Sequence, residues 1–500
     1  MTTTDSAADR LGRLILPALR WSDATGFDHE APAIARALEL GVGGFILFGG
    51  PADAVRTLTA DLVRRAGRPL LIGADLERGA GQQFAGLTEL PPPRALAALV
   101  ADGGTRALDA IRWAGAVTAH EARGVGVNWV FAPVADLDAL ADNPIVQTRA
   151  FGEDPARVAA CVAAWVEGCQ AADALACAKH YPGHGRTATD SHAGVPVVAA
   201  DAATLRAADG APFDAAIAAG VASLMTAHVA YPALDPTGRP ATFSAPILGH
   251  LRAAQRFAGL VVTDALIMEG ALAGQGEAQA GVEALRAGAD ILLYPNDVAA
   301  VRDALARALA TGELAAARVG EALERYERAL ARATAPAAPD APRGPFASAA
   351  ALADAILAGG LRRGDARDAV PALRAPLELA IVDDDVGGPY PASPSDHVAR
   401  ALAAAGLTLG EGGSRIVLAF AEPRAWKGRA GFGEPSRQAL AALAPDATLV
   451  VLFGHPRLVA EIPGQAPVLV AWHRQRLMQE AVARWIGGTA GGSVPRGAPV

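Results

Sequence analysis

The chain is organised around Leu175–His192, LACAKHYPGHGRTATDSH, where a short apolar run passes directly into a polar loop. The run Leu175–Ala178 is typical of a buried strand, and the loop Lys179–His192 contains one Lys, three His and one Asp. One Pro and two Gly residues in the loop disfavour a regular helix. A loop that leaves a buried element is where a rigid scaffold commonly presents chemical groups. We therefore expect a functional site at the end of this strand.

Similar apolar runs rich in Val, Ile and Leu recur along the first two thirds of the chain and alternate with Ala-rich helical stretches. This alternation indicates βα units and a parallel sheet. Eight units within Arg10–Arg332 predict an α/β fold with a (β/α)8 barrel of the TIM type, whose catalytic groups lie at the C-terminal ends of the strands. The runs predicted to be strands are Leu14–Leu19, Gly44–Phe48, Pro69–Ala74, Asn128–Pro133, Leu175–Ala178, Ser223–Ala227, Leu260–Thr263 and Asp290–Leu293.

Polar residues directly follow several of these predicted strands. In a barrel they would gather at one end and form a site. The alternative is that each acidic residue simply caps the helix that follows it. The residues concerned are Asp75, Glu77, Asp136, Lys179, His180, His228, Asp264 and Asn296.

The length of 500 residues predicts two domains, because a single core rarely grows that large. We expect a barrel domain at residues 1–332, a Pro/Ala-rich linker at residues 333–346, and a smaller open α/β domain, similar to a three-layer sandwich, at residues 347–500. The second domain has no GxGxxG after its first strand, so dinucleotide binding has no support. Its predicted elements are a helix near Ala347–Ala358 and strands at Leu377–Val382, Ile416–Phe420, Thr448–Phe453 and Pro467–Trp472.

The composition, 52% hydrophobic and 19% charged with a net charge of −8, is that of a globular protein. It gives no basic footprint for nucleic acid or for an anionic membrane, and we expect neither as a partner. Cys161, Cys169 and Cys177 predict core thiols in a reducing compartment rather than disulfides. The polar N-terminus, and the lack of an 18-residue apolar stretch, predict a cytoplasmic location.

Within the polar loop, Asp190 and His192 are separated by one residue and can form a carboxylate–imidazole hydrogen bond. Such a bond fixes the tautomer of the ring and raises its basicity. A structural or metal-binding His cluster is the alternative, but no HExxH or CxxC spacing accompanies the loop. We therefore predict neither a metal nor a cofactor.

The segment Lys179–His192 resembles the KHFPGHG...DSH signature of glycoside hydrolase family 3, in its β-N-acetylglucosaminidase branch. The resemblance implies that His192 is the general acid/base and that Asp190 is its partner. It also implies that Lys179 and His180 bind the sugar.

Two further segments are similar to sugar-binding segments of that family. TRAFGEDP, residues 148–155, resembles RSFGEDP, which implies that Arg149 holds sugar hydroxyls through its planar donor fork. GADLERGAGQQF, residues 73–84, resembles DxEGG..QR, which implies the same role for Asp75. Arg78, Ala80 and Gln83 depart from the family pattern, so the substrate contacts near them are left open.

The segment GLVVTDALIMEGA, residues 259–271, resembles the family's (S/T)D(D/A)L.M.A. In that pattern the first Asp attacks the anomeric carbon, which implies that Asp264 is the nucleophile. Taken without the resemblance, an Asp at a strand end is more often a helix cap.

These resemblances imply a retaining exo-β-N-acetylglucosaminidase that acts on small carbohydrates such as muropeptide or chitin-type fragments. Asp264 would be the nucleophile, and the Asp190–His192 dyad would serve as acid and then as base. The alternatives on the same site are a β-N-acetylglucosaminide phosphorylase and a β-glucosidase, and from another class a non-catalytic sugar-binding protein. The aglycone, the oligomeric state and the role of the C-terminal domain are left open by the sequence.

Overall fold

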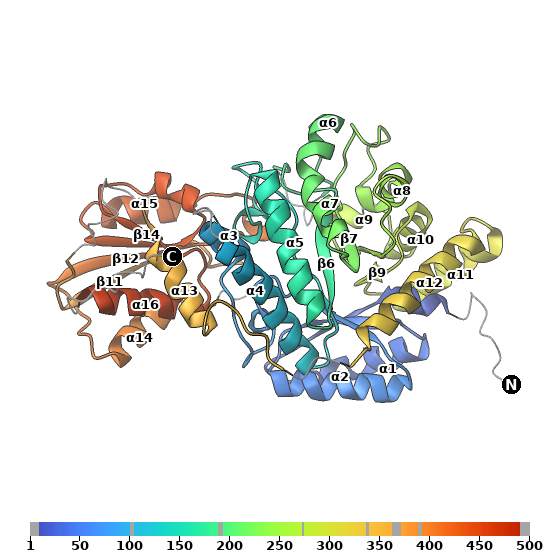
Figure 1. Ribbon diagram of the computed structural model, residues 1–500, viewed down its shortest axis with the longest axis horizontal. Coiled ribbons are helices and arrows are strands. Elements are labelled where there is room, and N and C mark those ends of the chain that lie inside the picture. Colours follow the sequence, from blue (N-terminus) through green and yellow to red (C-terminus); the bar gives the residue numbers. More distant parts are fainter. Residues whose placement is uncertain are drawn as a thin grey trace. The chain divides into compact units, whose positions relative to one another are not determined.

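The computed structural model describes residues 10–100, 105–188, 194–272, 275–336, 340–362, 372–388 and 393–490. The chain forms two compact units, each with its own sheet (Figure 1). Unit 1 comprises residues 1–88, 111–140 and 152–343, and unit 2 comprises residues 89–110, 141–151 and 344–500. Two short segments within the predicted barrel region thus belong to unit 2, and the last change of unit, after Arg343, falls within the predicted linker.

Unit 1 is built on parallel strands that lie side by side in chain order, from β2 to β8. Their inward and outward faces are almost entirely buried, as expected of parallel strands covered by helices. The strands are β2 (Ala18–Arg20), β3 (Gly44–Phe48), β4 (Leu71–Ala74), β5 (Trp129–Val130), β6 (Leu175–Tyr181), β7 (Ser223–Thr226) and β8 (Leu260–Thr263).

Two short strands close this sheet into a barrel. β1 (Ile15–Leu16) pairs in parallel with β9 (Leu292–Leu293), and only Pro17 separates β1 from β2. A parallel bridge from Val262 to Ile291 joins β8 to the residue that precedes β9. The first strand therefore continues past Pro17, which has no backbone N–H to give to the ladder. The predicted (β/α)8 barrel is confirmed, and each of the eight predicted strands overlaps an observed one. β6 continues to Tyr181, three residues beyond the predicted end at Ala178, so Lys179 and His180 lie on the strand and not in the loop.

Each strand of the barrel is followed by a helix. In α5, for example, Pro155 occupies the first turn and the Asp154 side chain accepts the backbone N–H of Arg157 at 2.8 Å, so the DP of the FGEDP segment is a helix start. The helices are α1 (Ala31–Glu39), α2 (Ala52–Ala66), α4 (Thr105–Gly124), α5 (Pro155–Ala171), α7 (Ala211–Ala218), α8 (Ala245–Ala253), α10 (Glu277–Ala287) and α11 (Val298–Thr311), with α12 (Ala316–Ala333) after α11.

The three cysteines are free and buried in the core of unit 1, as predicted. Burial raises the pKa of both Cys161 and Cys177 to about 12, which keeps these thiols protonated and unreactive at neutral pH. They therefore act as small apolar side chains of the core.

Unit 2 contains a five-stranded sheet in the order β10-β14-β13-β12-β11. Four strands are parallel, and the short β10 (Leu361–Arg362), which the sequence did not predict, adds an antiparallel edge. The parallel strands are β11 (Leu377–Asp383), β12 (Ser414–Ala421), β13 (Leu449–Gly454) and β14 (Val468–Val470). The prediction of an open α/β sheet is confirmed.

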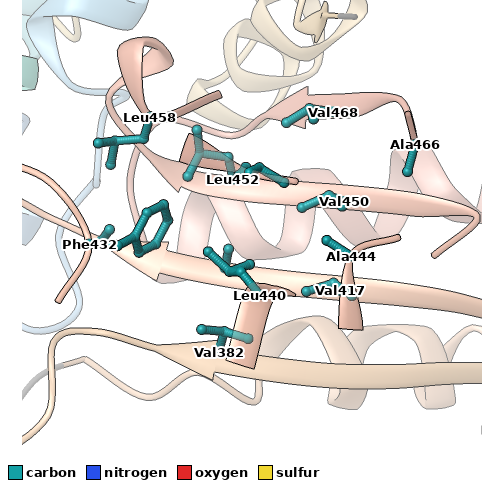
Figure 2. Packing of buried hydrophobic residues seen from close by; sticks show 13 residues of the cluster. Val382, Val417, Phe432, Leu440, Ala444, Val450, Leu452, Leu458, Ala466 and Val468 are labelled. Carbon is teal, nitrogen blue, oxygen red and sulfur yellow. The ribbon is translucent and has the colours of Figure 1, made fainter. Parts of the chain in front are cut away.

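Helices cover both faces of the unit 2 sheet, which gives three layers. On one face, α15 (Glu434–Leu443) brings Leu440 against Val417 and Val450, and Phe432 lies in the same cluster (Figure 2). On the opposite face lie α14 (His397–Ala404) and α16 (Arg476–Ala490), and α13 (Ala349–Ala358) packs against α16 (Figure 1). Among the residues that the structure describes, no helix is both long and apolar enough to cross a membrane.

Candidate active site

Lys179 is the centre of a buried ion-pair group at the C-terminal end of the barrel strands. Its Nζ lies 2.6 Å from Asp75 Oδ1 and 2.8 Å from Glu77 Oε1, and its side chain is only 3% exposed. Asp75 and Glu77 follow β4, whereas Lys179 lies on β6. These ion pairs therefore reach across the end of β5, which lies between the two strands in the sheet. The structure thus brings together two residues that the sequence predicted as sugar ligands, Asp75 and Lys179.

Strand β6 is irregular at His180. The register between β6 and β7 shifts between Lys179 and Tyr181, and such a bulge redirects a side chain. His180 Nδ1 is 2.7 Å from Asp136 Oδ2, and the His180 backbone N–H donates to Asp136 Oδ1 at 3.1 Å. The bond to Asp136 orients the ring and leaves Nε2 as its other hydrogen-bonding atom.

Asp136 is fully buried and stays ionised. Burial alone would raise its pKa, but the charge and hydrogen bond of His180 and the nearby His184 outweigh burial and leave the pKa below its ordinary value. The His184 backbone N–H also donates to Asp136 Oδ1, at 2.7 Å. One carboxylate therefore fixes both His180 and the start of the polar loop.

The loop after β6 is held by further buried contacts. His184 Nδ1 lies 2.8 Å from Thr187 Oγ1, and Tyr231 donates its hydroxyl to the Gly183 carbonyl at 2.8 Å. Burial and the neighbouring His180 lower the pKa of His184 to about 4, so its ring is neutral near pH 7. These contacts make residues 180–187 a packed support for the rest of the loop.

Asp264, the predicted nucleophile, directly follows β8. Its Oδ1 accepts the Ala265 backbone N–H at 2.7 Å. Burial lowers the pKa of His228, and the nearby Asp264 carboxylate opposes that shift. The same carboxylate also favours a higher pKa for His184 and for Cys177, which lies on β6. Because β6, β7 and β8 are parallel neighbours in one sheet, Asp264 lies at the same end of that sheet as Lys179 and His180.

We call Asp75, Glu77, Asp136, Lys179, His180 and Asp264 the strand-end cluster. All six were singled out in the sequence because they follow predicted strands, but their pairing was not predicted. His228 hydrogen-bonds Thr242 Oγ1 at 2.8 Å and the Ala265 carbonyl at 3.2 Å, so it supports the turn after Asp264. Asn296, from the same predicted set, instead donates to Glu277 on α10 at 3.0 Å.

Of the remaining predicted site residues, the structure describes only Arg149. Asp190 and His192 fall in 189–193, outside the described residues. Arg149 ends the short helix η4 (Gln147–Arg149), in the segment 141–151 that belongs to unit 2. In the described part of the chain, no group of three or more His, Cys, Asp and Glu is arranged to hold a metal ion.

Sequence reasoning overlooked Asp209, which forms a buried ion pair with Arg186 of the polar loop at 2.7 Å. Asp209 follows no predicted strand and matches no quoted motif, so nothing in the sequence marked it. The sequence also suggested no role for Tyr231, although its hydroxyl group donates a hydrogen bond to the Gly183 carbonyl and so holds the loop.

Comparisons with known proteins identify the family. Residues 22–329 match the Glycosyl hydrolase family 3 N terminal domain. A β-hexosaminidase of Thiobacillus denitrificans is 39% identical over 272 residues, which cover 53% of this chain and 75% of the relative. A Cellulomonas fimi protein named β-N-acetylglucosaminidase/β-glucosidase is 38% identical over 257 residues, 49% of this chain and 44% of the relative.

A solved structure extends the likeness to both units. The glycoside hydrolase family 3 β-N-acetylglucosaminidase from Paenibacillus sp. str. FPU-7 has a TM-score of 0.81 at 27% identity, covering 98% of this chain and 97% of that one. The chain therefore belongs to glycosyl hydrolase family 3 and is a glycoside hydrolase.

Proposed function

We propose that the protein is a retaining exo-β-N-acetylglucosaminidase that hydrolyses terminal β-linked N-acetylglucosamine. The observation that carries the proposal is the strand-end cluster, in which Asp75 and Lys179 are in direct contact and Asp264 follows β8 at the same end of the parallel sheet. The names of the relatives, β-hexosaminidase and β-N-acetylglucosaminidase, support the choice of sugar.

The first chemical step is attack by Asp264. Its carboxylate oxygen forms a bond to the anomeric carbon while the bond to the leaving oxygen breaks, and His192 gives its proton to that oxygen. The products of this step are a glycosyl ester on Asp264, a neutral His192 and the free aglycone. Asp190 would hold the His192 ring in the orientation needed for the transfer.

The second step reverses the roles of the dyad. Neutral His192 takes a proton from water as the water oxygen bonds to the anomeric carbon, and the ester bond to Asp264 breaks. The sugar leaves with its original anomeric configuration after two displacements, and Asp264 and His192 return to their starting states.

The charge of the cluster suits this chemistry. The transition state of glycoside hydrolysis carries positive charge on the sugar ring. Of the six residues of the cluster, four are carboxylates and Lys179 is the only permanently charged cation, so the local field favours that developing charge. Lys179, Asp75, His180 and Arg149 are the proposed ligands of the sugar hydroxyls.

The natural substrate is proposed to be a muropeptide or chitin-type fragment, and a cytoplasmic location remains a prediction from the sequence. A panel of nitrophenyl β-glycosides tests the sugar, because the name of the Cellulomonas fimi relative also includes β-glucosidase. We expect kcat/KM to be highest for the N-acetylglucosaminide. A higher kcat/KM for the glucoside would show that the proposed sugar specificity is wrong and that the enzyme is a β-glucosidase.

The nucleophile is tested by trapping. A fluorinated N-acetylglucosaminyl donor should label the enzyme once per chain, and peptide mass spectrometry should place the label on Asp264. The Asp264→Asn variant should remain unlabelled and lose activity by about 10⁴-fold or more. Labelling of another carboxylate, or full labelling of Asp264→Asn, would reject this assignment.

A further inference from the structure

His228 is a buried histidine that the proposed mechanism does not use. It lies just after β7, and it is 0% exposed. Its Nδ1 is 2.8 Å from Thr242 Oγ1, and its Nε2 is 3.2 Å from the carbonyl oxygen of Ala265. Thr242 lies on the short helix η6 (Ala241–Phe243). Ala265 directly follows Asp264, the proposed nucleophile, so the ring joins the end of β7 to the turn that carries the nucleophile.

The contacts of the His228 ring determine its tautomer. Burial lowers the pKa of His228, so the ring is neutral near pH 7 and carries a single proton on one of its two nitrogens. A carbonyl oxygen can only accept a hydrogen bond, so the proton lies on Nε2, which donates to Ala265. Nδ1 is then an acceptor, and it receives the proton of the Thr242 hydroxyl.

A second hydroxyl group extends this chain of hydrogen bonds into the sheet. Thr226 Oγ1, on β7, lies 2.8 Å from Thr242 Oγ1. The single hydroxyl proton of Thr242 is given to His228, so Thr226 is the donor in this contact. The hydrogen bonds therefore run in one direction, from Thr226 through Thr242 and His228 to the Ala265 carbonyl. All three side chains are completely buried, and the low local dielectric strengthens the bonds between them.

The turn after β8 is bound to the strands on both sides of it. On the β9 side, the Leu293 N–H donates to Thr263 Oγ1 at 3.0 Å, and the Leu266 N–H donates to the Leu293 carbonyl at 2.9 Å. On the β7 side, the bond comes from His228 to Ala265. The nucleophile therefore lies in a short segment that is anchored before and after it.

The residue that His228 holds also binds the carboxylate of the proposed nucleophile. The Ala265 backbone N–H donates to Asp264 Oδ1 at 2.7 Å. His228 binds the carbonyl of the same residue, so the direction of that N–H depends on the ring. Reacting atoms need to lie about 3–3.5 Å apart, and misplacement by about 1 Å can cost on the order of 100-fold in rate. A small rotation of Ala265 would therefore slow the attack on the sugar.

We propose that His228 is a positioning residue of the glycosidase reaction and sets the place of the Asp264 carboxylate through the Ala265 backbone. Thr226 and Thr242 hold the ring in the orientation that this task needs. The inference rests on the proposed function, in which Asp264 is the nucleophile. It assigns a task to β7, a strand that carries none of the proposed catalytic or sugar-binding residues.

The test measures how fast the glycosyl-enzyme forms on Asp264. The first-order rate constant of labelling is measured at saturating fluorinated N-acetylglucosaminyl donor, and sugar binding is measured as the inhibition constant of N-acetylglucosamine. Thr242→Val should lower the rate constant about 10- to 100-fold and change the inhibition constant by less than about threefold. A purely structural role would lower the number of labelled sites and leave the rate constant of each site unchanged, and that result would overturn the proposal.

Conservative variants provide a rescue in the same assay. Thr242→Ser keeps the hydroxyl that donates to Nδ1 and should restore most of the rate. His228→Gln offers an amide N–H in place of the Nε2 donor and should retain more of the rate than His228→Leu, which has no donor. The Ala265 carbonyl also accepts the Met268 N–H at 3.1 Å, so the turn should still close in each variant. Equal rate constants within both pairs of variants would show that the hydrogen bonds do not matter.

Thr118→Val is the matched control. Thr118 is also completely buried, and its hydroxyl donates to the Ala114 carbonyl at 2.8 Å within α4. Its replacement should lower thermal stability and leave the labelling rate constant unchanged. An equal fall of the rate constant in Thr118→Val would overturn the proposal, because the loss would then follow from any missing buried hydrogen bond.

The position of the label separates the two levels of the argument. If the label lies on Asp264 and Thr242→Val reacts at the original rate, the positioning role is wrong and the proposed function stands. If peptide mass spectrometry places the label on another carboxylate, the nucleophile assignment is wrong, and the inference falls with it.

Discussion

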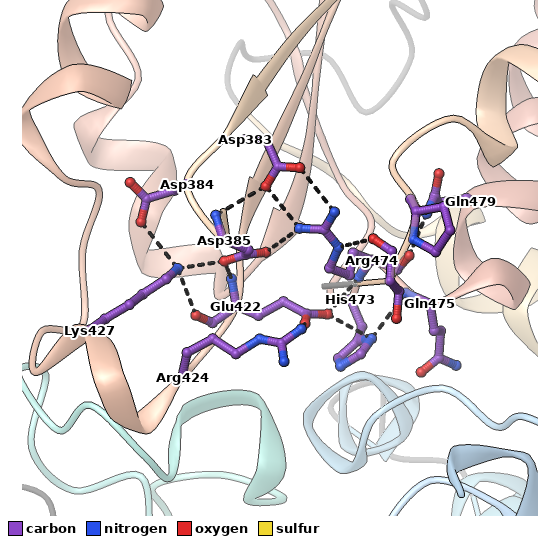
Figure 3. Close-up of polar contacts among 12 residues, drawn as sticks. Asp383, Asp384, Asp385, Glu422, Arg424, Lys427, His473, Arg474, Gln475 and Gln479 are labelled. Carbon is purple, nitrogen blue, oxygen red and sulfur yellow. Dashed lines mark hydrogen bonds and ion pairs between the residues drawn. The ribbon is translucent and has the colours of Figure 1, made fainter. Parts of the chain in front are cut away.

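Both units carry buried charges at the C-terminal ends of their parallel strands, but the charges are balanced differently. In unit 2, four carboxylates, four cations and the titratable His473 form one network, and Figure 3 labels all of these except Arg429. In the strand-end cluster of unit 1, four carboxylates accompany Lys179 and the titratable His180. The carboxylates of the unit 2 network are Asp383, Asp384, Asp385 and Glu422, and its cations are Arg424, Lys427, Arg429 and Arg474.

We interpret the difference as a structural use of the strand ends in unit 2 and the chemical use proposed above in unit 1. Arg474 is 2% exposed and binds both Asp383 and Asp385, while Lys427 binds Asp384 and Asp385. Every carboxylate of that network has a cationic partner, so the network fixes loops and leaves little net field. The unit 1 cluster leaves an excess of negative charge, which suits a cationic transition state. Position at strand ends is therefore not enough to mark a site, and charge balance is the better guide.

Removing the central cation of each group tests this comparison most strongly. Lys179→Met should lower kcat/KM by at least about 100-fold, because a proposed sugar ligand is lost and the buried Glu77 loses its ion pair with Lys179. Arg474→Met should cost about 3–5 kcal/mol of stability, because Asp383 loses its cationic partner and Asp385 loses one of its two, keeping Lys427. Its kcat per active site should stay within about threefold of the original, since the active site is proposed to lie in the barrel.

Active sites are counted with the fluorinated donor, and stability is measured by calorimetry on the same samples. Lys179→Met combined with Glu77→Gln is the matched control, and it should recover stability but not activity. A tenfold loss of kcat per labelled site in Arg474→Met would assign the unit 2 network a catalytic role. The division into a structural network in unit 2 and a chemical cluster in unit 1 would then be wrong.

The barrel could be predicted because its physical signal is local. Strands buried on both faces are continuous apolar runs, so Gly44–Phe48 and Leu260–Thr263 were predicted with the observed ends. The two-residue β10 was missed, because Leu361–Arg362 is too short to show a period. The assignment of residues 89–110 and 141–151 to unit 2 was also missed, because it depends on tertiary contacts rather than on composition.

The site was predictable only to the level of single residues. Asp75, Lys179 and Asp264 were predicted as site residues because each follows a predicted strand and matches a family motif. The partners of Lys179 and His180 lie 104 and 44 residues away, so only the closed barrel determines them. Asp209 follows no predicted strand and matches no quoted motif, and its ion pair with Arg186 depends on packing in the folded chain.

The second prediction uses pH to separate the two units. The pKa of His184 falls from an ordinary value near 6.5 to about 4 on folding, so the unfolded chain takes up a proton first as the pH drops. Stability from this group is present above about pH 6.5 and is lost as the pH falls toward 4. The free energy of unfolding of unit 1 should fall by up to about 3 kcal/mol between pH 6.5 and pH 4, since a shift of one pKa unit corresponds to about 1.4 kcal/mol.

Unit 2 should respond at lower pH. Burial would raise the pKa of Asp384, but Arg429, the Gly433 N–H and Lys427 outweigh it and hold the pKa below its ordinary value. Its contribution is lost only as the pH falls below about 4. Thermal unfolding followed by proteolysis and mass spectrometry reports on each unit separately. His184→Asn should flatten the response of unit 1 between pH 6.5 and 4, and an unchanged slope would show that another group is responsible.

The smallest effect is expected from phosphate, and the same charge imbalance explains why. In the proposed mechanism the acid/base is a neutral imidazole after the first step, so it would not repel an incoming anion. The carboxylates of the strand-end cluster remain, and they oppose a phosphate more than a neutral water. Lys179 is engaged by Asp75 and Glu77, and Arg186 by Asp209, so the two cations of the loop already have carboxylate partners. An anionic acceptor would have to compete with those partners.

We therefore expect free N-acetylglucosamine to be the main product at physiological phosphate, with the rate changed by less than about twofold when phosphate is added. Product analysis by NMR during the first turnovers distinguishes the free sugar from the sugar 1-phosphate. If Arg186 is kept from anions by Asp209, Asp209→Asn should raise the fraction of sugar 1-phosphate. Asp290→Asn, which changes a buried, ion-paired carboxylate before β9, is the matched control and should not. Sugar 1-phosphate as the main product of the unaltered enzyme would make it a phosphorylase, with Asp264 and His192 in the same roles. It would also show that an excess of carboxylates does not exclude an anionic acceptor.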